Sequence, residues 1–291
     1  MGYIEFSKPY QVEKITPVQH TFHNHPLFTL DSLREAAKSL PKHLIRFHAN
    51  TARADSSFEQ VEKHHPSKHS FEDAISNLEN SGSWIALHHL QEIPEYAEVL
   101  KEALDQISST TNALDPGLHW RVLWVFIQSP YSLTPFHMDH ENNFLMQVSG
   151  KKTAYLWNRY DCLTDQDHEH FHGTSSRNQI KFLEEYRKKA TIVNLSPGNG
   201  AYMPAGSPHL VENGDNVAIT ISMTYLTERT RKRETFYRCN HALRKLGMNP
   251  APYPSNKATK FHLFNGYLNT RKMLTGKSKL PTWMTDVNGG I

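Results

Sequence analysis

Residues 134–152 read TPFHMDHENNFLMQVSGKK, the most informative stretch of the chain for fold and function. After a turn-forming Thr-Pro pair comes the triplet His-Met-Asp, with His137 and Asp139 at its ends, and then an apolar run that stops at Gly150. Successive residues of a strand point to opposite faces, so His137 and Asp139 share one face. Two such side chains, joined by a histidine from a distant strand, make a metal site with open coordination positions.

The histidine that completes the site is expected in a β-rich segment beyond a turn, and His209 fits this position. It follows the turn sequence Pro-Gly-Asn-Gly at 197–200 and a strand-like run at 201–204. The chain has nineteen histidines, and four polar rivals lie closer in sequence: His140, His168, His170 and His172. The sequence Asp-His-Glu-His-Phe-His at 167–172 could hold a second metal ion, but a solvated flexible loop is the preferred interpretation.

From His119 onward, short runs of β-branched and aromatic residues alternate with turn signals. Many short strands at such spacing are typical of a sandwich or barrel. The predicted strands are 120–128, 143–148, 153–157, 190–195, 201–204 and 217–226. The expected fold class is therefore mainly β with flanking helices.

The part before the β-rich segment alternates between helix and strand. Apolar residues at helical spacing predict helices near 31–40, 70–81 and 94–107, with strands at 43–48 and 84–90. We therefore expect three parts: an N-terminal α+β segment packed on the barrel (1–118), the β core (119–228) and a C-terminal helical segment (229–291).

A polar, His-rich insertion at 158–189 interrupts the core and includes a predicted helix near 181–188. Loops of this length are usually functional lids or disordered, so we expect 160–177 to be a mobile lid beside the substrate entrance. After the core, apolar residues at helical spacing predict helices over 236–246 and 261–268. These C-terminal helices are expected to form a homodimer, with packing back on the barrel as the alternative.

Composition and charge exclude several classes of protein. Hydrophobic residues are 38% and charged residues 21% of the chain, as in ordinary globular proteins and unlike disordered ones. No apolar run reaches the roughly eighteen residues of a membrane span, and residues 1–10 do not read as a secretory signal, so a cytoplasmic protein is expected. Cys162 and Cys239 lie far apart without C-x-x-C spacing, which predicts two reduced thiols.

The C-terminal segment is basic. From residue 228 onward, thirteen Lys or Arg stand against three Asp or Glu, although the net charge of the whole chain is only +3. Such a segment can meet an acidic partner or an acidic surface of its own fold. The second interpretation is preferred.

Within 134–152 the chain resembles the JmjC and cupin-like hydroxylases. Their pattern T-P-x-H-x-D, then N-F, then Q-[IV]-x-G-x-K is filled at every position. Pro-Gly-Asn-Gly-Ala-Tyr-Met-Pro at 197–204, followed by four residues and His209, is similar to the second motif of these proteins, as is the run at 219–223. The motif is most similar to that of the branch that includes the asparaginyl hydroxylase of hypoxia-inducible factor, and the resemblance covers residues 119–228.

The resemblance implies a double-stranded β-helix, the jelly-roll core of cupin and JmjC proteins, in which His137, Asp139 and His209 bind Fe(II). It implies a dioxygenase that consumes O2 and 2-oxoglutarate, releases succinate and CO2, and hydroxylates a protein side chain, an amino acid or a small molecule. The chain departs from the asparaginyl hydroxylase on the substrate side. It has His140 in place of an acidic residue and Thr224 in place of an asparagine.

By the same resemblance, Lys152 and Thr134 bind the distal carboxylate of 2-oxoglutarate, and Asn143 lines that pocket. A lysine supplies a point charge and a threonine a hydroxyl donor, which together satisfy an anion taken out of water. Lys152 shares a strand face with Ala154, which predicts an interior position. The plain alternatives are a turn lysine like Lys151, an ordinary turn threonine and a strand-edge asparagine.

Two other functions fit part of this pattern. A metal-binding cupin that works without 2-oxoglutarate, such as an isomerase, would not need Lys152. A non-catalytic peptide-binding module of JmjC type would not need three intact metal ligands. The sequence leaves the primary substrate open.

Overall fold

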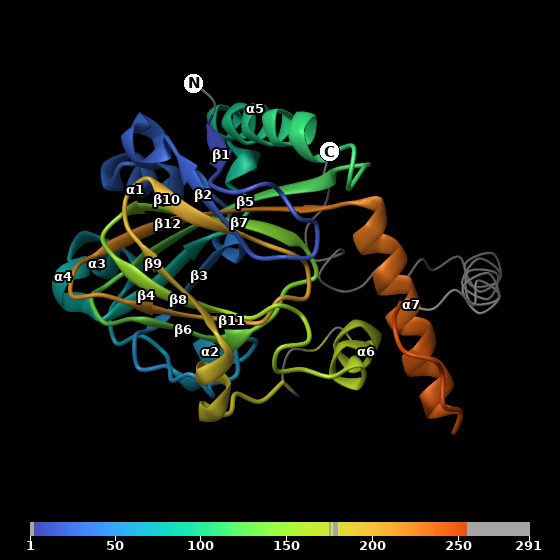
Figure 1. Ribbon diagram of the computed structural model, residues 1–291. Coiled ribbons are helices and arrows are strands. Elements are labelled where there is room, and N and C mark those ends of the chain that lie inside the picture. The colour runs from blue at the N-terminus through green and yellow to red at the C-terminus, as the bar shows by residue number, and fades with distance from the viewer. Residues whose placement is uncertain (1–2, 175, 177–179, 255–291) are drawn as a thin grey trace.

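The computed structural model describes residues 3–174, 176 and 180–254, and two antiparallel β-sheets form its centre (Figure 1). The larger sheet has the order β1 (Ile4–Phe6), β2 (Thr16–His20), β10 (Asn199–Met203), β7 (Asn142–Ser149), β12 (Ala218–Leu226), β5 (His119–Gln128), β4 (Ser83–Leu87) and β3 (Ile45–Ala49). The smaller has the order β6 (Leu133–His137), β11 (His209–Asn213), β8 (Lys152–Leu156) and β9 (Thr191–Leu195). This architecture is the expected double-stranded β-helix with flanking helices.

All six strands predicted for the core overlap observed strands. The N-terminal segment adds four more strands to the larger sheet. The pair β1 and β2 joins it beside β10, and β3 and β4 join it beside β5. The sequence indicated β3 and β4 but not β1 and β2, which are short and gain their hydrogen bonds only by pairing with the core.

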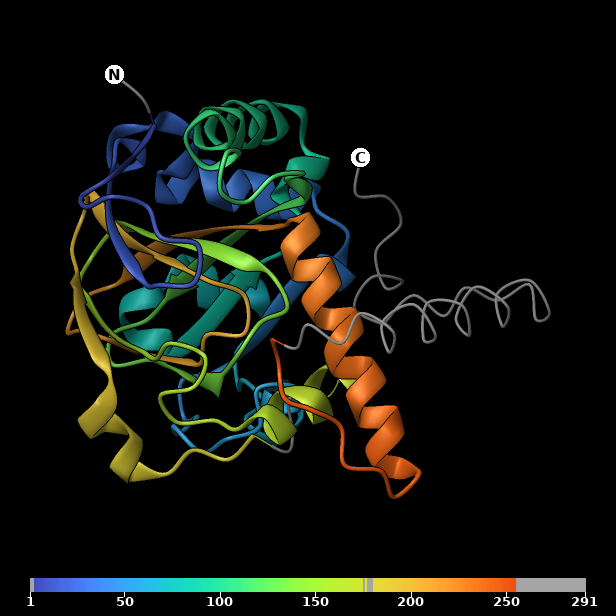
Figure 2. The same cartoon turned by 45° about the vertical axis from the view of Figure 1, so that its right-hand side comes forward.

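Helices cover the outer face of the larger sheet (Figure 2). The described helices are α1 (Leu30–Ser39), α2 (Val61–His64), α3 (Phe71–Ser76), α4 (Leu78–Ser81), α5 (Pro94–Thr111), α6 (Asp165–Thr174) and α7 (Glu228–Lys245). Short 3-10 turns are η1 (Phe22–Asn24), η2 (Pro26–Phe28), η3 (Lys42–Leu44), η4 (Leu90–Glu92) and η5 (Glu184–Lys189). Apolar faces of α1 and α5 pack on the sheet, as their sequence period predicts.

The space between the two sheets has its own apolar core. Leu145 and Ala201 from the larger sheet meet Ala154, Leu156 and Val211 from the smaller. Because side chains alternate along a strand, the neighbours of Leu145 on β7 face the outer helices instead. The inner core occupies part of the barrel, and polar side chains line the remaining interior.

Two predicted helices differ in detail from those observed. The helix expected over 70–81 begins as predicted, with Ser70 Oγ accepting from Asp73 N at 3.1 Å, but it is divided into α3 and α4 at Asn77. Gly82 follows α4 with a φ of 56°, the left-handed geometry of a helix C-terminus. The helix expected near 181–188 is the 3-10 turn η5.

The interpretation of 167–172 as a solvated flexible loop is wrong. These residues belong to α6, and His168, Glu169, Phe171 and His172 are buried in it. Helix α6 lies beside α7 in both views (Figures 1 and 2). The polar composition of the segment does not reveal this burial, because its partners lie far along the chain: Asn240 Nδ2, 71 residues after Glu169, donates to Glu169 Oε1 at 2.9 Å. Mobility of 160–177 as a lid stays a prediction.

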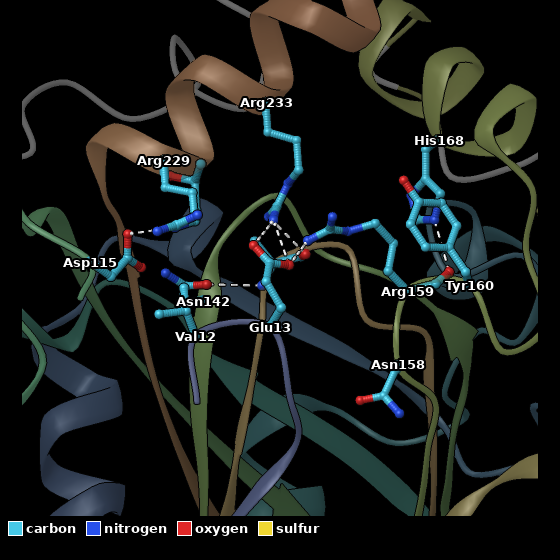
Figure 3. A network of polar contacts seen from close by, with 12 residues as sticks. Val12, Glu13, Asp115, Asn142, Asn158, Arg159, Tyr160, His168, Arg229 and Arg233 are labelled. Atoms are coloured by element: carbon cyan, nitrogen blue, oxygen red, sulfur yellow. Dashed lines mark hydrogen bonds and ion pairs between the residues drawn. The ribbon is translucent and has the colours of Figure 1, made fainter. Parts of the chain in front are cut away.

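Helix α7 is fastened to the barrel by a partly buried polar network (Figure 3). Arg233 and Arg159 both pair with the Glu13 carboxylate, and Arg233 Nη1 lies 3.0 Å from Glu13 Oε1. Arg233 Nη2 also donates to the carbonyl oxygen of Ala205 at 2.8 Å. Because Ala205 lies in the loop before β11, α7 is tied to the segment that delivers His209.

The second predicted C-terminal helix, 261–268, lies outside the described residues. The homodimer expected through these helices therefore stays a prediction. Among the described helices, none has the length and apolarity that crossing a membrane requires.

Gly150 lies in the turn between β7 and β8, and substituting it tests how far this turn depends on glycine. It has a φ of 72°, and a Cβ there would lie 2.4 Å from the carbonyl oxygen of Val217. Left-handed backbone costs other residues about 1–2 kcal/mol, and the backbone clash adds to it. We expect Gly150→Ala to lower the free energy of unfolding by roughly 2–4 kcal/mol in urea denaturation.

Gly247 gives the matched control for that substitution. Its φ is 76°, but nothing lies within 4 Å of a Cβ placed there. Gly247→Ala therefore carries the left-handed strain without the clash, and equal losses in the two variants would contradict the steric account of the turn.

Candidate metal centre

Strands β6 and β11 bring the two predicted histidine ligands together. His209 pairs directly with His137 in the register of these strands, and their ring centroids are 4.1 Å apart. Between this pair and the next, two residues of β6, Pro135 and Phe136, oppose the single residue Leu210. Such bulges re-aim side chains, and Pro135 suits an edge strand because it has no N–H to pair.

Backbone carbonyls orient both imidazole rings. His137 Nδ1 lies 2.7 Å from the oxygen of Pro135, and His209 Nδ1 lies 3.1 Å from the oxygen of Ser207. A carbonyl oxygen can only accept, so each Nδ1 carries the hydrogen and each Nε2 keeps its lone pair. This is the second hydrogen bond that fixes metal-binding histidines in many proteins.

Asp139 completes the triad. Its Oδ2 lies 3.6 Å from His209 Nε2 and 3.9 Å from His137 Nε2, and the ligand atoms of all three residues lie within 4.8 Å of one another. The group can therefore hold one metal ion. Asp139 lies two residues beyond the end of β6, not within the strand as the alternation argument assumed, and its carbonyl oxygen accepts from Gly206 N at 2.8 Å.

The N-terminal segment supplies the rim of this centre. The Phe58 ring stacks on the His137 ring at 3.9 Å with an interplanar angle of 4°. The guanidinium of Arg46 lies over the Phe58 ring, 4.8 Å from its centroid, and pairs with Glu62. No motif in the sequence pointed to Phe58 or Arg46, because only the tertiary fold brings residues this far upstream to the metal ligands.

A single cavity joins the triad to the residues predicted to bind a co-substrate. Its lining includes all three triad residues together with Thr134, Asn143 and Lys152. Lys152, Ala154 and Leu156 face the interior, which confirms the predicted face of β8. Lys151, one residue earlier, is exposed.

Lys152 is an unusual residue for such a cavity wall. Its side chain is 4% exposed, and Nζ donates to Gln128 Oε1 at 2.5 Å. Burial lowers the pKa of Lys152 from 10.5 to about 7, because a neutral amide compensates poorly for lost hydration. An isolated buried ammonium is costly, so this position favours an anionic ligand.

Thr134 belongs to the same hydrogen-bond network. Its Oγ1 accepts from Trp84 Nε1 at 3.0 Å and from Gln128 Nε2 at 3.2 Å. With both lone pairs used, the hydroxyl hydrogen is left to donate. Thr134 and Lys152 are thus two donors whose positions Gln128 fixes through opposite ends of its amide. No motif in the sequence pointed to Gln128, although a glutamine that ends an apolar strand is a recognisable signal.

On the other wall, Asn143 and Thr224 add polar groups. Ser222 Oγ donates to Asn143 Oδ1 at 2.8 Å, which leaves the amide NH2 of Asn143 to face an acceptor. Thr224 Oγ1 is buried and makes no hydrogen bond within the described part of the chain. The cavity therefore offers donors on two walls around the metal ligands.

Comparison with known proteins identifies the fold. Residues 7–230 match the family model described as a cupin-like domain. A search of the curated proteins finds no match to the chain. Among solved structures, the ribosomal oxygenase YcfD from Escherichia coli, in complex with cobalt and 2-oxoglutarate, is 14% identical with a TM-score of 0.49, over 94% of this chain and 69% of that one.

Two further solved structures have lower scores. Another structure of YcfD from Escherichia coli is 16% identical with a TM-score of 0.44, over 87% of this chain and 60% of that one. The DMSP lyase DddQ from Ruegeria pomeroyi is 12% identical with a TM-score of 0.23, over 36% of this chain and 37% of that one.

Proposed function

The chain belongs to the family of cupin-like domains, and on that premise we propose that it is an Fe(II)- and 2-oxoglutarate-dependent oxygenase. Within the oxygenases we favour a hydroxylase of a protein side chain, an amino acid or a small molecule, because the motif around His137 and Asp139 resembles that branch. Iron and 2-oxoglutarate, when bound, would supply oxygen activation and hydroxylation of a C–H bond, with succinate and CO2 as products.

One observation carries the proposal. A single cavity is lined by a His-Asp-His group that can hold a metal ion and by a buried lysine whose partner is neutral. A 2-oxo acid with a second carboxylate matches both ends, since one end chelates a metal and the other is an anion for Lys152 and Thr134.

The residues of the chain would divide the work as follows. His137, Asp139 and His209 would leave coordination positions open on the side of the cavity. Lys152 and Thr134 would hold the distal carboxylate, and Gln128 would position both donors. The stacked Phe58 ring would keep His137 in place and exclude water from one side of the metal.

The two alternative functions, a metal cupin without 2-oxoglutarate and a peptide-binding module, each leave a feature of this cavity without a role. A metal cupin without 2-oxoglutarate has no need to bury Lys152 against a neutral amide. A peptide-binding module has no need of two imidazoles whose Nδ1 hydrogens are both engaged by carbonyl oxygens. Both features have a use in the proposed oxygenase, which is why we prefer it.

The proposed function can be tested by turnover. Iron-loaded protein would be incubated with 2-oxoglutarate, O2 and pools of peptides and amino acids, and succinate and the mass gain of one oxygen would be measured. We expect iron-dependent succinate together with one oxidised product class. The proposal fails if iron and 2-oxoglutarate bind in the cavity as predicted and yet no succinate forms with any pool.

The pKa of Lys152 predicts a pH dependence of co-substrate binding. Without ligand its pKa is about 7, and a bound carboxylate raises it, so binding takes up a proton between the two values. Affinity for 2-oxoglutarate should therefore be highest below about pH 7 and fall by up to about tenfold per pH unit above it.

Anaerobic titrations of 2-oxoglutarate into the iron-loaded protein from about pH 6 to pH 9 would check this. Asp139 and Glu141 are the carboxylates that line the cavity. Lys152→Arg, which stays charged, should bind with little pH dependence. An unchanged wild-type affinity between pH 7 and 9 would show that Lys152 is not the carboxylate's partner.

A further inference from the structure

A second group of metal-binding side chains lies next to the triad and shares no residue with it. His140 directly follows Asp139, His172 lies on α6, and Glu234 lies on α7. Their ligand atoms all lie within 4.8 Å of one another. The three residues are 3%, 3% and 8% exposed, so three separate segments converge in the interior.

The distance between the two imidazoles fits a shared metal ion. His140 Nδ1 and His172 Nδ1 are 3.1 Å apart. Zn–N bonds are about 2.0–2.1 Å, so two of them meeting at roughly 100–110° place their nitrogens about 3.1–3.4 Å apart. Without a metal, two like nitrogens face each other and one must donate to the other.

One imidazole of the cluster has a nitrogen without a hydrogen-bond partner in the described part of the chain. His172 Nε2 is buried without a hydrogen bond among the described residues. Glu234 is a buried carboxylate whose charged partner, Arg238, lies 3.6 Å away.

Aromatic rings fix both imidazoles in place. The Phe171 ring stacks on His140 with centroids 4.1 Å apart and an angle of 19°. The Tyr237 ring lies against His172 at 5.2 Å and 12°. A ligand set held by packing in this way is pre-organised, so little ordering is needed when an ion binds.

We propose that His140, His172 and Glu234 bind a divalent transition metal ion, preferentially zinc. The ion would fasten α6 and α7 to the segment that follows Asp139. Two imidazoles and a carboxylate are ligands that zinc accepts, with a fourth position for the second carboxylate oxygen or a water. All three ligands are buried, and a carboxylate that binds through both of its oxygens would close the site, as in structural zinc sites.

The site gives His140 a role that the first motif does not explain. The insertion carrying α6 and the C-terminal helix α7 would both be anchored one residue from a ligand of the triad. Because an ion that binds only the folded chain stabilises it, zinc should raise the unfolding temperature, by about 5–10 °C at a hundredfold excess over Kd.

The experiment counts zinc in a chain that lacks the other site. Full-length His209→Ala, which disables the triad, would be freed of metal with a chelator and titrated with zinc against a chromophoric competitor. We expect one equivalent to bind and to raise the unfolding temperature. Adding Glu234→Gln or His172→Ala should lower zinc affinity more than about 100-fold and abolish the thermal shift.

His170→Ala, in the same His209→Ala background, is the matched control, because it removes a histidine of α6 that is not in the cluster. This variant should still bind one equivalent of zinc and show the same rise in unfolding temperature. The proposal is overturned if His209→Ala binds no zinc, or if its zinc survives both Glu234→Gln and His172→Ala. If His172→Ala fails to fold, the proposal is still tested by the zinc equivalents bound to His209→Ala alone and to the same variant with the near-isosteric Glu234→Gln. Neither count involves 2-oxoglutarate, so the result is independent of the proposed oxygenase activity.

Discussion

Lys152→Ala is expected to weaken the binding of 2-oxoglutarate by about two to three orders of magnitude while leaving metal binding nearly intact. Lys152 is buried, and Gln128, the partner of its ammonium, is neutral. Its loss would leave the distal carboxylate buried without a charged partner. Breaking a buried ion pair costs about 3–5 kcal/mol, and about 1.4 kcal/mol is a factor of ten in Kd.

The neighbouring lysine is the control. Lys151 is exposed on the opposite face of the turn, so Lys151→Ala should change the affinity by less than about twofold. Anaerobic titration of 2-oxoglutarate into both iron-loaded variants makes the comparison. Equal losses in the two variants would mean that the co-substrate does not reach the wall formed by β8.

Asp139→Ala is the second substitution with a large expected effect. It removes the carboxylate of the triad, whose oxygen lies 3.6 Å from His209 Nε2. Losing only a partner that orients a metal ligand typically costs about 10–100-fold in metal affinity, so losing a ligand should cost more than about 100-fold. Oxygenase turnover should fall with it to background.

Glu141 provides a matched carboxylate for this test. It lines the same cavity but does not belong to the His-Asp-His group. Anaerobic Fe(II) binding in the presence of 2-oxoglutarate would be followed by the visible absorption of the metal chelate. Glu141→Ala should keep this absorption and Asp139→Ala should lose it. If both variants keep it, the metal is held by other residues.

The sequence could predict the triad because local chemistry and strand alternation both act over a few residues. The spacing of His137 and Asp139 and their setting beside a predicted strand indicated the pair, and a turn and a strand before His209 indicated the third member. The family resemblance then favoured His209 over four rival histidines. What alternation could not predict was the bulge at Pro135 or the position of Asp139 beyond the strand end. Both depend on how β6 pairs with β11, and pairing is a property of the assembled sheet.

The interior face of β8 was also predictable, because Ala154 and Leu156 mark it. The neutral partner of Lys152 was not. Gln128 ends β5 in the larger sheet, and it meets Lys152 of the smaller sheet only across the barrel. A contact between distant segments cannot be predicted from one segment alone. The sequence therefore indicated Lys152 but not Gln128, which positions it.

Helix α6 is the clearest failure of reasoning from composition. Its histidines and acidic residues look solvated, yet His168 and His172 are buried against Tyr237 of α7. Tertiary packing overrides the local pattern here. The same packing brings His140 and Glu234 to His172, so the ligands of the proposed zinc site could be identified only after the helices had been placed.

Binding of a metal by the triad and of 2-oxoglutarate by Lys152 would be seen in a crystal structure, from crystals grown anaerobically with Fe(II) or Mn(II) and 2-oxoglutarate. The account predicts the metal within about 2.0–2.3 Å of His137 Nε2, Asp139 and His209 Nε2, with the distal carboxylate of 2-oxoglutarate against Lys152 Nζ and Thr134 Oγ1. A metal absent from the triad, or 2-oxoglutarate bound with its distal carboxylate away from Lys152, would contradict it.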